Sequence, residues 1–179
     1  MGKRIMFMDA DFSKNGLKIV TDMKWVFGLQ YQNLDAANST KLNEQGIAVF
    51  DAANCKNFES TQKRITKIRF DAAKDGVFQI LKVDKDDYKN YEVIQEIECA
   101  VGNAQEIDVD IEIGGNHYLG LKNISPSGTN AALSYHHEIG DYGVGMKFIM
   151  RPNSDNSVVY DFPNSVIRID FLNETERYE

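Results

Sequence analysis

Residues 106–113 read Glu-Ile-Asp-Val-Asp-Ile-Glu-Ile, and this stretch decides the fold class. Aliphatic and acidic residues alternate along it without a fault, and the sequence Gly114-Gly115-Asn116 follows it at once. A period of two is typical of a β-strand, which places alternate side chains on opposite faces of a sheet. The glycine pair is a turn signal. The sequence therefore predicts a strand over 105–113 with one buried aliphatic face and one acidic face.

The acidic face consists of Glu106, Asp108, Asp110 and Glu112. Such a row could bind a cation or a basic partner. More often it is the solvent-exposed face of a strand, and its acids pair with lysine and arginine side chains across the sheet. We favour the second interpretation, in which the row is solvated surface or part of a subunit contact.

Short β-like runs separated by turn signals extend along the rest of the chain. They cover 3–8, 23–29, 46–50, 63–70, 76–83, 91–101, 117–122, 131–137, 142–150, 158–162 and 165–172. The last run repeats the alternation, because Ile167, Ile169 and Phe171 are separated by Arg168 and Asp170. Regular short strands with turns between them are typical of a sandwich or a barrel. We therefore predict an all-β fold: an antiparallel, jelly-roll-like β-sandwich of about ten strands.

No repeat, linker or low-complexity block divides the 179 residues, so a single domain over 1–179 is expected. Residues 30–45 are polar and predict a long surface loop. Helical turns are conceivable only over 51–59 and 71–74. Residues 173–179 are polar and are predicted to form a tail that frays.

The composition excludes several classes of partner. A net charge of −7 argues against nucleic acid, because phosphate binding needs clustered lysine and arginine. No stretch approaches the about 20 apolar residues of a membrane span, and the apolar run after Met1 is too short for a signal peptide. We therefore expect synthesis in a cytoplasm and no membrane partner. Cys55 and Cys99 stand alone and are expected to be reduced thiols.

No motif in the chain predicts catalysis or a resident metal. Residues 9–16 superficially suggest a calcium loop but lack the glycine and the bidentate glutamate of an EF-hand. The acidic run Asp84–Asp87 is expected to be a solvated loop, and His117, His136 and His137 lack the spacing of zinc ligands. Neither Gly-x-Ser-x-Gly nor a Gly-Asp-Ser block is present. We predict no enzyme, no catalytic residues, no metal site and no cofactor.

The aromatic residues are the remaining candidates for a binding site. Rings that could serve as platforms are Trp25, Tyr31, Tyr88, Tyr91, Tyr118, Tyr135 and Tyr142. Sugar C–H groups stack on such rings when polar side chains nearby bond the hydroxyls. Most of the rings are expected to be core or half-buried sheet residues, with Trp25 in the core. We select Tyr118 and Tyr135 as candidate sugar contacts.

Two stretches resemble known proteins. The run Gly2 to Gly16, with Ala10-Asp11-Phe12-Ser13 at its centre, resembles the start of many proteins from gut Bacteroidales and their phages, including head- and tail-fibre-like proteins. The runs 64–70 and 76–80, with the Gly-rich turn that leads into Tyr118-Leu-Gly120, resemble jelly-roll accessory domains. Domains of that type occur on phage fibres and beside esterases of the Gly-Asp-Ser-Leu type.

The catalytic block of those esterases is absent from this chain, so the function that the resemblance implies is one without catalysis. The resemblance implies a non-enzymatic structural or adhesive module, associated with a phage virion after synthesis in the host cytoplasm. Fibres are commonly trimers, so it also implies a homo-oligomer that contacts other virion subunits. Residues 1–20 would then form an N-terminal attachment segment that docks to a neighbouring subunit. The alternative is a carbohydrate-binding module of a gut bacterium, cytoplasmic in location, with a surface glycan as its ligand.

Overall fold

The computed structural model of the chain describes residues 19–26, 40–41, 45–50, 63–114, 116–124, 133–136, 146–162 and 166–178. These residues form thirteen β-strands and no helix, which confirms the all-β prediction. The predicted strand over 3–8, the calcium-like run 9–16 and the helical turn over 51–59 lie outside the described residues.

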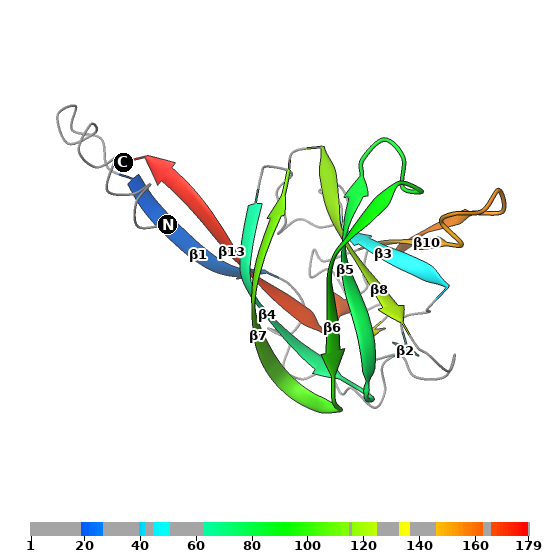
Figure 1. Ribbon diagram of the computed structural model, residues 1–179, viewed down its shortest axis with the longest axis horizontal. Coiled ribbons are helices and arrows are strands. Elements are labelled where there is room, and N and C mark those ends of the chain that lie inside the picture. Colours follow the sequence, from blue (N-terminus) through cyan, green and yellow to red (C-terminus); the bar gives the residue numbers. More distant parts are fainter. Residues whose placement is uncertain are drawn as a thin grey trace.

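The strands form two large antiparallel sheets and one small sheet (Figure 1). The four-stranded sheet has the order β1 (Ile19–Val26), β13 (Ile169–Tyr178), β4 (Lys63–Ala72) and β7 (Gly102–Ile113). The six-stranded sheet has the order β11 (Val158–Phe162), β10 (Met146–Met150), β3 (Gly46–Phe50), β8 (His117–Ile124), β5 (Gly76–Asp84) and β6 (Tyr91–Cys99). The small sheet has the order β12 (Val166–Ile167), β9 (Ser134–His136) and β2 (Thr40–Lys41).

The pairing of the strands is that of a jelly roll. Along the chain, the strands of the main sandwich pair from the outside inwards: β1 with β13, β3 with β8, β4 with β7, and β5 with β6. Nested pairs of this kind roll up into two facing sheets when β13 also pairs with β4 and β8 with β5. The hairpin of β10 and β11 is an addition between β8 and β13, and it extends the six-stranded sheet beyond β3.

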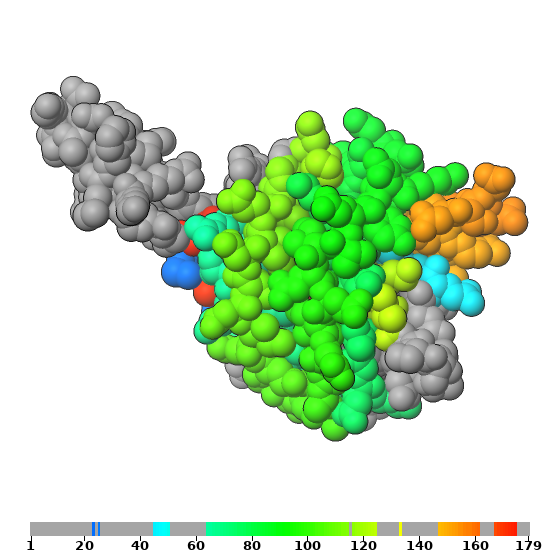
Figure 2. Space-filling view, viewed as in Figure 1, coloured from blue at the N-terminus to red at the C-terminus, as the bar shows by residue number. Residues whose placement is uncertain are grey.

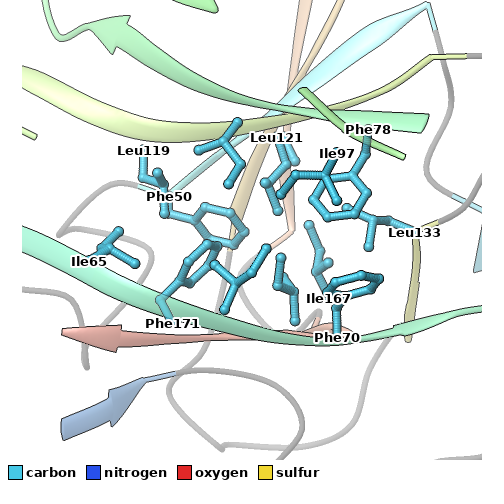
Figure 3. Close-up of a cluster of buried hydrophobic side chains, with 14 of the residues drawn as sticks. Phe50, Ile65, Phe70, Phe78, Ile97, Leu119, Leu121, Leu133, Ile167 and Phe171 are labelled. Atoms are coloured by element: carbon cyan, nitrogen blue, oxygen red, sulfur yellow. The ribbon is translucent and has the colours of Figure 1, made fainter. Parts of the chain in front are cut away.

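Alternation along the strands directs one face of each large sheet into a common core. In β7, Ile111 and Ile113 are buried whereas Asp110 and Glu112 are exposed, as the period of two predicts. Figure 3 shows the core side chains lying between the two sheets. Two edge-to-face aromatic pairs join the sheets, and their ring centroids are 6.1 Å apart for Phe50 and Phe171 and 5.1 Å apart for Phe70 and Phe78.

The six-stranded sheet is also apolar on the middle of its outer face. All five residues of β3 are buried, and the four after Gly46 divide between two clusters. Ala48 and Phe50 point into the sandwich core, whereas Ile47 and Val49 belong to a second cluster. The second cluster is completed by Leu81, Val83 and Ile149, with Tyr88, Tyr91 and Tyr118 packed against it. The five buried residues of this second cluster form an apolar layer on the outer face of the sheet, which we name the apolar floor.

The polar tail predicted over 173–179 is a strand as far as Tyr178. β13 pairs with β4 only as far as Glu174, but it continues beside β1, where Tyr178 pairs with Ile19. The start of β1 and the end of β13 thus form a two-stranded arm that extends away from the sandwich (Figure 1). The prediction of a frayed tail was wrong. Residues 173–178 are polar, but β1 provides them with a partner strand from the other end of the chain.

The polar residues of the alternating run 167–171 are buried, which the alternation did not predict. Ile167, Ile169 and Phe171 line the core as expected. Asp170 is nevertheless fully buried, and it accepts a hydrogen bond of 2.9 Å from Arg69. Arg168 is also buried and pairs with Asp71. Buried charges of this kind are tolerated because each carries an opposite charge as its partner.

Asp71 belongs to a strand and not to the helical turn considered over 71–74. β4 continues to Ala72 and is followed by a bend. The Asp71 carboxylate also accepts a hydrogen bond of 2.6 Å from the backbone N–H of Ala104, whose φ is 51°. This contact holds the irregular register between β4 and β7. The loop predicted over 30–45 contains the short strand β2, which the polar composition concealed.

Candidate functional site

The acidic face of β7 is paired with cations of its neighbour β4. Arg64 donates two hydrogen bonds to Asp110, from Nε at 2.8 Å and from Nη2 at 3.2 Å. Lys67 Nζ lies 3.5 Å from Glu106 and 3.4 Å from Asp108. The interpretation of the row as an exposed face with ion pairs across the sheet is confirmed. The described residues contain no group of three or more histidine, cysteine, aspartate or glutamate side chains that could hold a metal ion.

These ion pairs shift the protonation equilibria of the groups that form them. The hydrogen bond from Arg64 lowers the pKa of Asp110, and the charge of Asp108 raises the pKa of Lys67. Both shifts favour the charged forms at neutral pH. Asp110 is therefore a compensated carboxylate, and the direction of its pKa shift is opposite to that of a general acid, whose pKa is raised.

The two candidate sugar contacts lie on different sheets. Tyr118 is the second residue of β8 of the six-stranded sheet, and its half-buried side chain lies on the outer face. Tyr135 lies in β9 of the small sheet, where its backbone pairs with Thr40 and Ile167. The structure therefore does not unite them in one described site.

Tyr118 instead belongs to a group of aromatic and basic side chains, which we name the tyrosine–lysine cluster. Its members are Lys85, Tyr88, Tyr91, Tyr118, Lys122 and Lys147. The rings of Tyr88 and Tyr118 are 6.3 Å apart at an angle of 39°. Each tyrosine ring has a lysine Nζ above it, at 5.0 Å for Lys85 over Tyr118, at 6.0 Å for Lys122 over Tyr91, and at 5.8 Å for Lys147 over Tyr88.

The cluster rests on the apolar floor formed by the second set of buried residues. Tyr88, Tyr91 and Tyr118 all pack against that floor. Gly120 lies within it, because a Cβ there would approach the Cγ2 of Val83 to 2.7 Å and the Cβ of Leu81 to 3.2 Å. The rings are therefore held from below by packing, while the half-buried lysine side chains lie above them.

Two connections frame the cluster. The connection from β5 to β6 is an Asx turn, in which Asp84 accepts hydrogen bonds from the N–H groups of Asp86 and Asp87 at 2.8 and 3.3 Å. This solvated turn was predicted from the sequence. On the other side, the turn between β10 and β11 brings Asn153 to the cluster, where its amide donates a bond of 3.4 Å to the hydroxyl of Tyr91.

The sequence identified the tyrosines of this cluster only as members of a longer list of aromatics. It did not identify the lysines, because they come from the β5–β6 connection, β8 and β10 and share no spacing. Only the strand pairing brings Lys147 of β10 near Tyr88, since β3 and β8 lie between β10 and β5. No pattern in the sequence predicts that Lys147 and Tyr88 lie close together.

The structure also shows the surroundings of Trp25 and Cys99, two residues that the sequence analysis considered. Trp25 was expected in the core but is half-buried, and the Arg69 guanidinium lies 4.5 Å from its ring centroid. Cys99 is a buried free thiol, as predicted, and burial raises its pKa. A thiol with a raised pKa is a poor nucleophile at neutral pH. Cys55 lies outside the described residues.

Comparisons of the chain with protein-family models, with curated proteins and with solved structures return no match. The resemblance to phage fibre-like proteins therefore stays a prediction from the sequence. Within the described ranges, no helix is long and apolar enough to cross a membrane.

Proposed function

We propose that this chain is a non-enzymatic structural or adhesive module that assembles with copies of itself, as head- or tail-fibre-like proteins of phage virions do. The virion assignment rests on the N-terminal resemblance. The assembly part rests on one observation, the exposed apolar edge formed by β11. Within the described sheets, β11 has a neighbouring strand on one side only. Figure 2 shows the segment of β10 and β11 projecting from one end of the molecule.

Apolar side chains are exposed on both faces of β11. Val159 is 48% exposed, and Tyr160, which points to the opposite face, is 47% exposed. The edges formed by β6 and β7 differ, because β6 exposes three glutamates and β7 exposes its acidic row. Charged edges resist pairing with another strand, whereas an apolar edge favours it. Of these three edges, β11 is the one suited to a subunit contact.

A second copy of the chain fits this edge. When two β11 strands pair antiparallel about Tyr160, Val158 pairs with Phe162 and Val159 pairs with Asp161. No acid then faces another acid, and the pairing has the two-fold symmetry that is commonest among oligomers. Main-chain hydrogen bonds would join the two six-stranded sheets.

The same antiparallel pairing of two copies is unfavourable at the edge formed by β7, whose exposed face is acidic. Two β7 strands paired about Val109 would place Asp108 opposite Asp110 and Glu106 opposite Glu112. Like charges directly opposite each other destabilise a strand pair. The contrast supports β11 as the self-pairing edge.

The experiment compares two valine-to-aspartate substitutions on opposite edges of one sheet. Val159→Asp places an acid opposite Asp161 of the other copy, where like charges destabilise a strand pair. Val93→Asp is its control, because Val93 is 44% exposed on the edge strand β6. We expect Val159→Asp to lower the mass of the assembly measured by light scattering and Val93→Asp to leave it unchanged. Equal masses for both variants would contradict the role of β11, and a trimer would contradict two-fold pairing.

The proposed attachment segment can be tested separately. Ile19 and Val20 of the predicted segment belong to β1, and residues 1–18 lie outside the described residues. Deleting residues 1–16 leaves β1 complete, so the sandwich should still fold. We expect loss of docking to a partner subunit, measured by co-purification. Unchanged partner binding and oligomeric mass would count against the segment as an attachment site.

A carbohydrate-binding module is the second candidate function. The observation that favours it is the position of Tyr118 in a group of supported rings on a sheet face. Glycan-array binding by the intact chain that is lost in Tyr118→Ala would support this function. Binding that persists in the variant would place the glycan site elsewhere.

A further inference from the structure

We propose that the tyrosine–lysine cluster is a binding site for acidic sugars, of which a uronic acid, with a carboxylate attached to its pyranose ring, is the simplest. This inference rests on the adhesive part of the proposed function and names the ligand class. Three features of the cluster carry it: oriented rings, two lysines, Lys85 and Lys122, that form no ion pair within the described residues, and hydrogen-bonding groups at the rim.

The rings are oriented before any ligand binds. Tyr88 and Tyr118 pack against the buried floor of Leu81, Val83 and their neighbours, so their ring planes are fixed by packing. Both rings remain half-buried, and part of each is open to solvent. A pyranose ring presents C–H groups on one face, and these pack on aromatic rings held in this way.

The lysines are distinguished by their partners. In the described part of the chain, Lys85 and Lys122 form no ion pair, and their ammonium groups lie over tyrosine rings. Lys147 is shared between Tyr88 and Asp161, whose carboxylate is 3.9 Å away. On the four-stranded sheet, by contrast, Arg64 and Lys67 are paired with carboxylates.

An ammonium group over a ring still has donors to offer. Each lysine has three N–H donors, and a cation–π contact leaves them available to an anion that approaches from solvent. A carboxylate is the simplest such anion, and its hydrogen bonds with ammonium groups are charge-assisted. The sugar ring and its carboxylate would thus contact a tyrosine face and a lysine at once.

The rim of the cluster supplies neutral polar groups. Asn153 is exposed, and its amide bonds the hydroxyl of Tyr91. The side-chain carbonyl of Asn153 and the hydroxyl of Tyr91 can each accept a bond from a sugar hydroxyl. These groups fit a saccharide, which carries several hydroxyls, better than they fit a simple inorganic anion.

Tyrosines and lysines together are also typical of single-stranded nucleic acid sites. The surroundings of this cluster disfavour that ligand. Asp84 ends β5, and Asp86 and Asp87 lie in the same connection as Lys85 and Tyr88. The chain also has a net charge of −7. A phosphodiester chain must neutralise many phosphates along its length, whereas one uronic acid needs only one or two cations.

The test measures binding of the full-length chain to an oligomer of galacturonic acid and to the methyl ester of the same oligomer, by calorimetry. The two probes share the sugar ring and differ in the charge. We expect the acid to bind about tenfold more tightly than the ester, the order of effect of one charge-assisted hydrogen bond. The difference should shrink in high salt.

Variants of the cluster locate the site. We expect Lys122→Gln and Lys85→Gln each to weaken binding of the acid about tenfold. The control is Lys74→Gln, an exposed lysine in the turn between β4 and β5, which should leave the affinity unchanged. Neither cluster variant removes a buried group, so thermal unfolding should match that of the parent chain.

Three results would overturn the inference. Equal affinity for acid and ester would indicate a site for neutral sugars. Tighter binding of a single-stranded oligonucleotide that Lys122→Gln abolishes would assign the cluster to nucleic acid. Absence of sugar binding, in a chain whose assembly depends on Val159, would remove the acidic-sugar site and leave the structural function intact.

Discussion

At the scale of single residues, neighbours in β7 have opposite roles because they lie on opposite faces. Ile111 is fully buried in the core, and Asp110 is an exposed partner of Arg64. We expect Ile111→Asp to lower the free energy of unfolding by more than about 3 kcal/mol, because it buries a charge without a partner. Asp110→Asn should be nearly neutral. Urea unfolding measures both, and equal large losses would show that the facing of β7 is wrong.

The pKa of Asp110 gives this pair a defined dependence on pH. The folded pKa lies below the usual 3.8, so the ionised carboxylate stabilises the fold above that pH. The contribution is lost as the pH falls through the folded pKa. We therefore expect any difference in stability between the parent chain and Asp110→Asn to be constant near neutral pH and to vanish as the pH falls from 3.8 through the lower folded pKa. A difference that grows in acid would contradict the pairing with Arg64.

Gly120 lies in the apolar floor beneath the tyrosine–lysine cluster, where its neighbours leave no room for a side chain. A Cβ at Gly120 would lie 2.7 Å from Val83, so Gly120→Ala should cost about 1–3 kcal/mol through overpacking. Gly114→Ala is the control, because the nearest atom to its Cβ would be 3.9 Å away, on His117. Thermal unfolding of the two variants separates crowding from a general effect of replacing glycine in this region. Similar midpoints for both variants would argue against the close approach at Gly120.

At the scale of elements, the sequence predicted strands well wherever an alternating or apolar run was present. β3 and β11 have the predicted bounds, and β7 contains the predicted run. The exceptions are polar strands, above all the end of β13. Its residues 173–178 lack an apolar period, and they form a strand because β1 pairs with them along its length. A partner contributed by the other end of the chain leaves no local signal.

Removal of this strand end provides a test of its role. Truncation after Leu172 deletes the part of β13 that pairs with residues 19–24 and removes the buried Glu174. We expect a clearly lower thermal midpoint and rapid hydrogen exchange in β1. Deletion of Glu179 alone is the control and should change neither. A truncated chain as stable as the parent would mean that residues 173–178 behave as the frayed tail that their composition predicts.

At the scale of the whole molecule, the sequence predicted the sandwich but not the order of its strands. Periodicity shows which face of a strand is buried, whereas the nested pairing of β1 with β13 and of β3 with β8 joins distant segments. The same limit applies to the candidate site. Tyr118 was identified as an aromatic residue after a turn. Lys122 and Lys147 become candidates for the site only because the sheet places them above the rings of Tyr91 and Tyr88.

We propose that this jelly roll assembles with itself through β11. The decisive measurement is the mass of the intact chain in solution, determined by light scattering over a range of concentrations. We expect a species of about twice 20.3 kDa that dissociates on dilution or on Val159→Asp substitution. A mass of 20.3 kDa at every concentration would rule out self-assembly through β11.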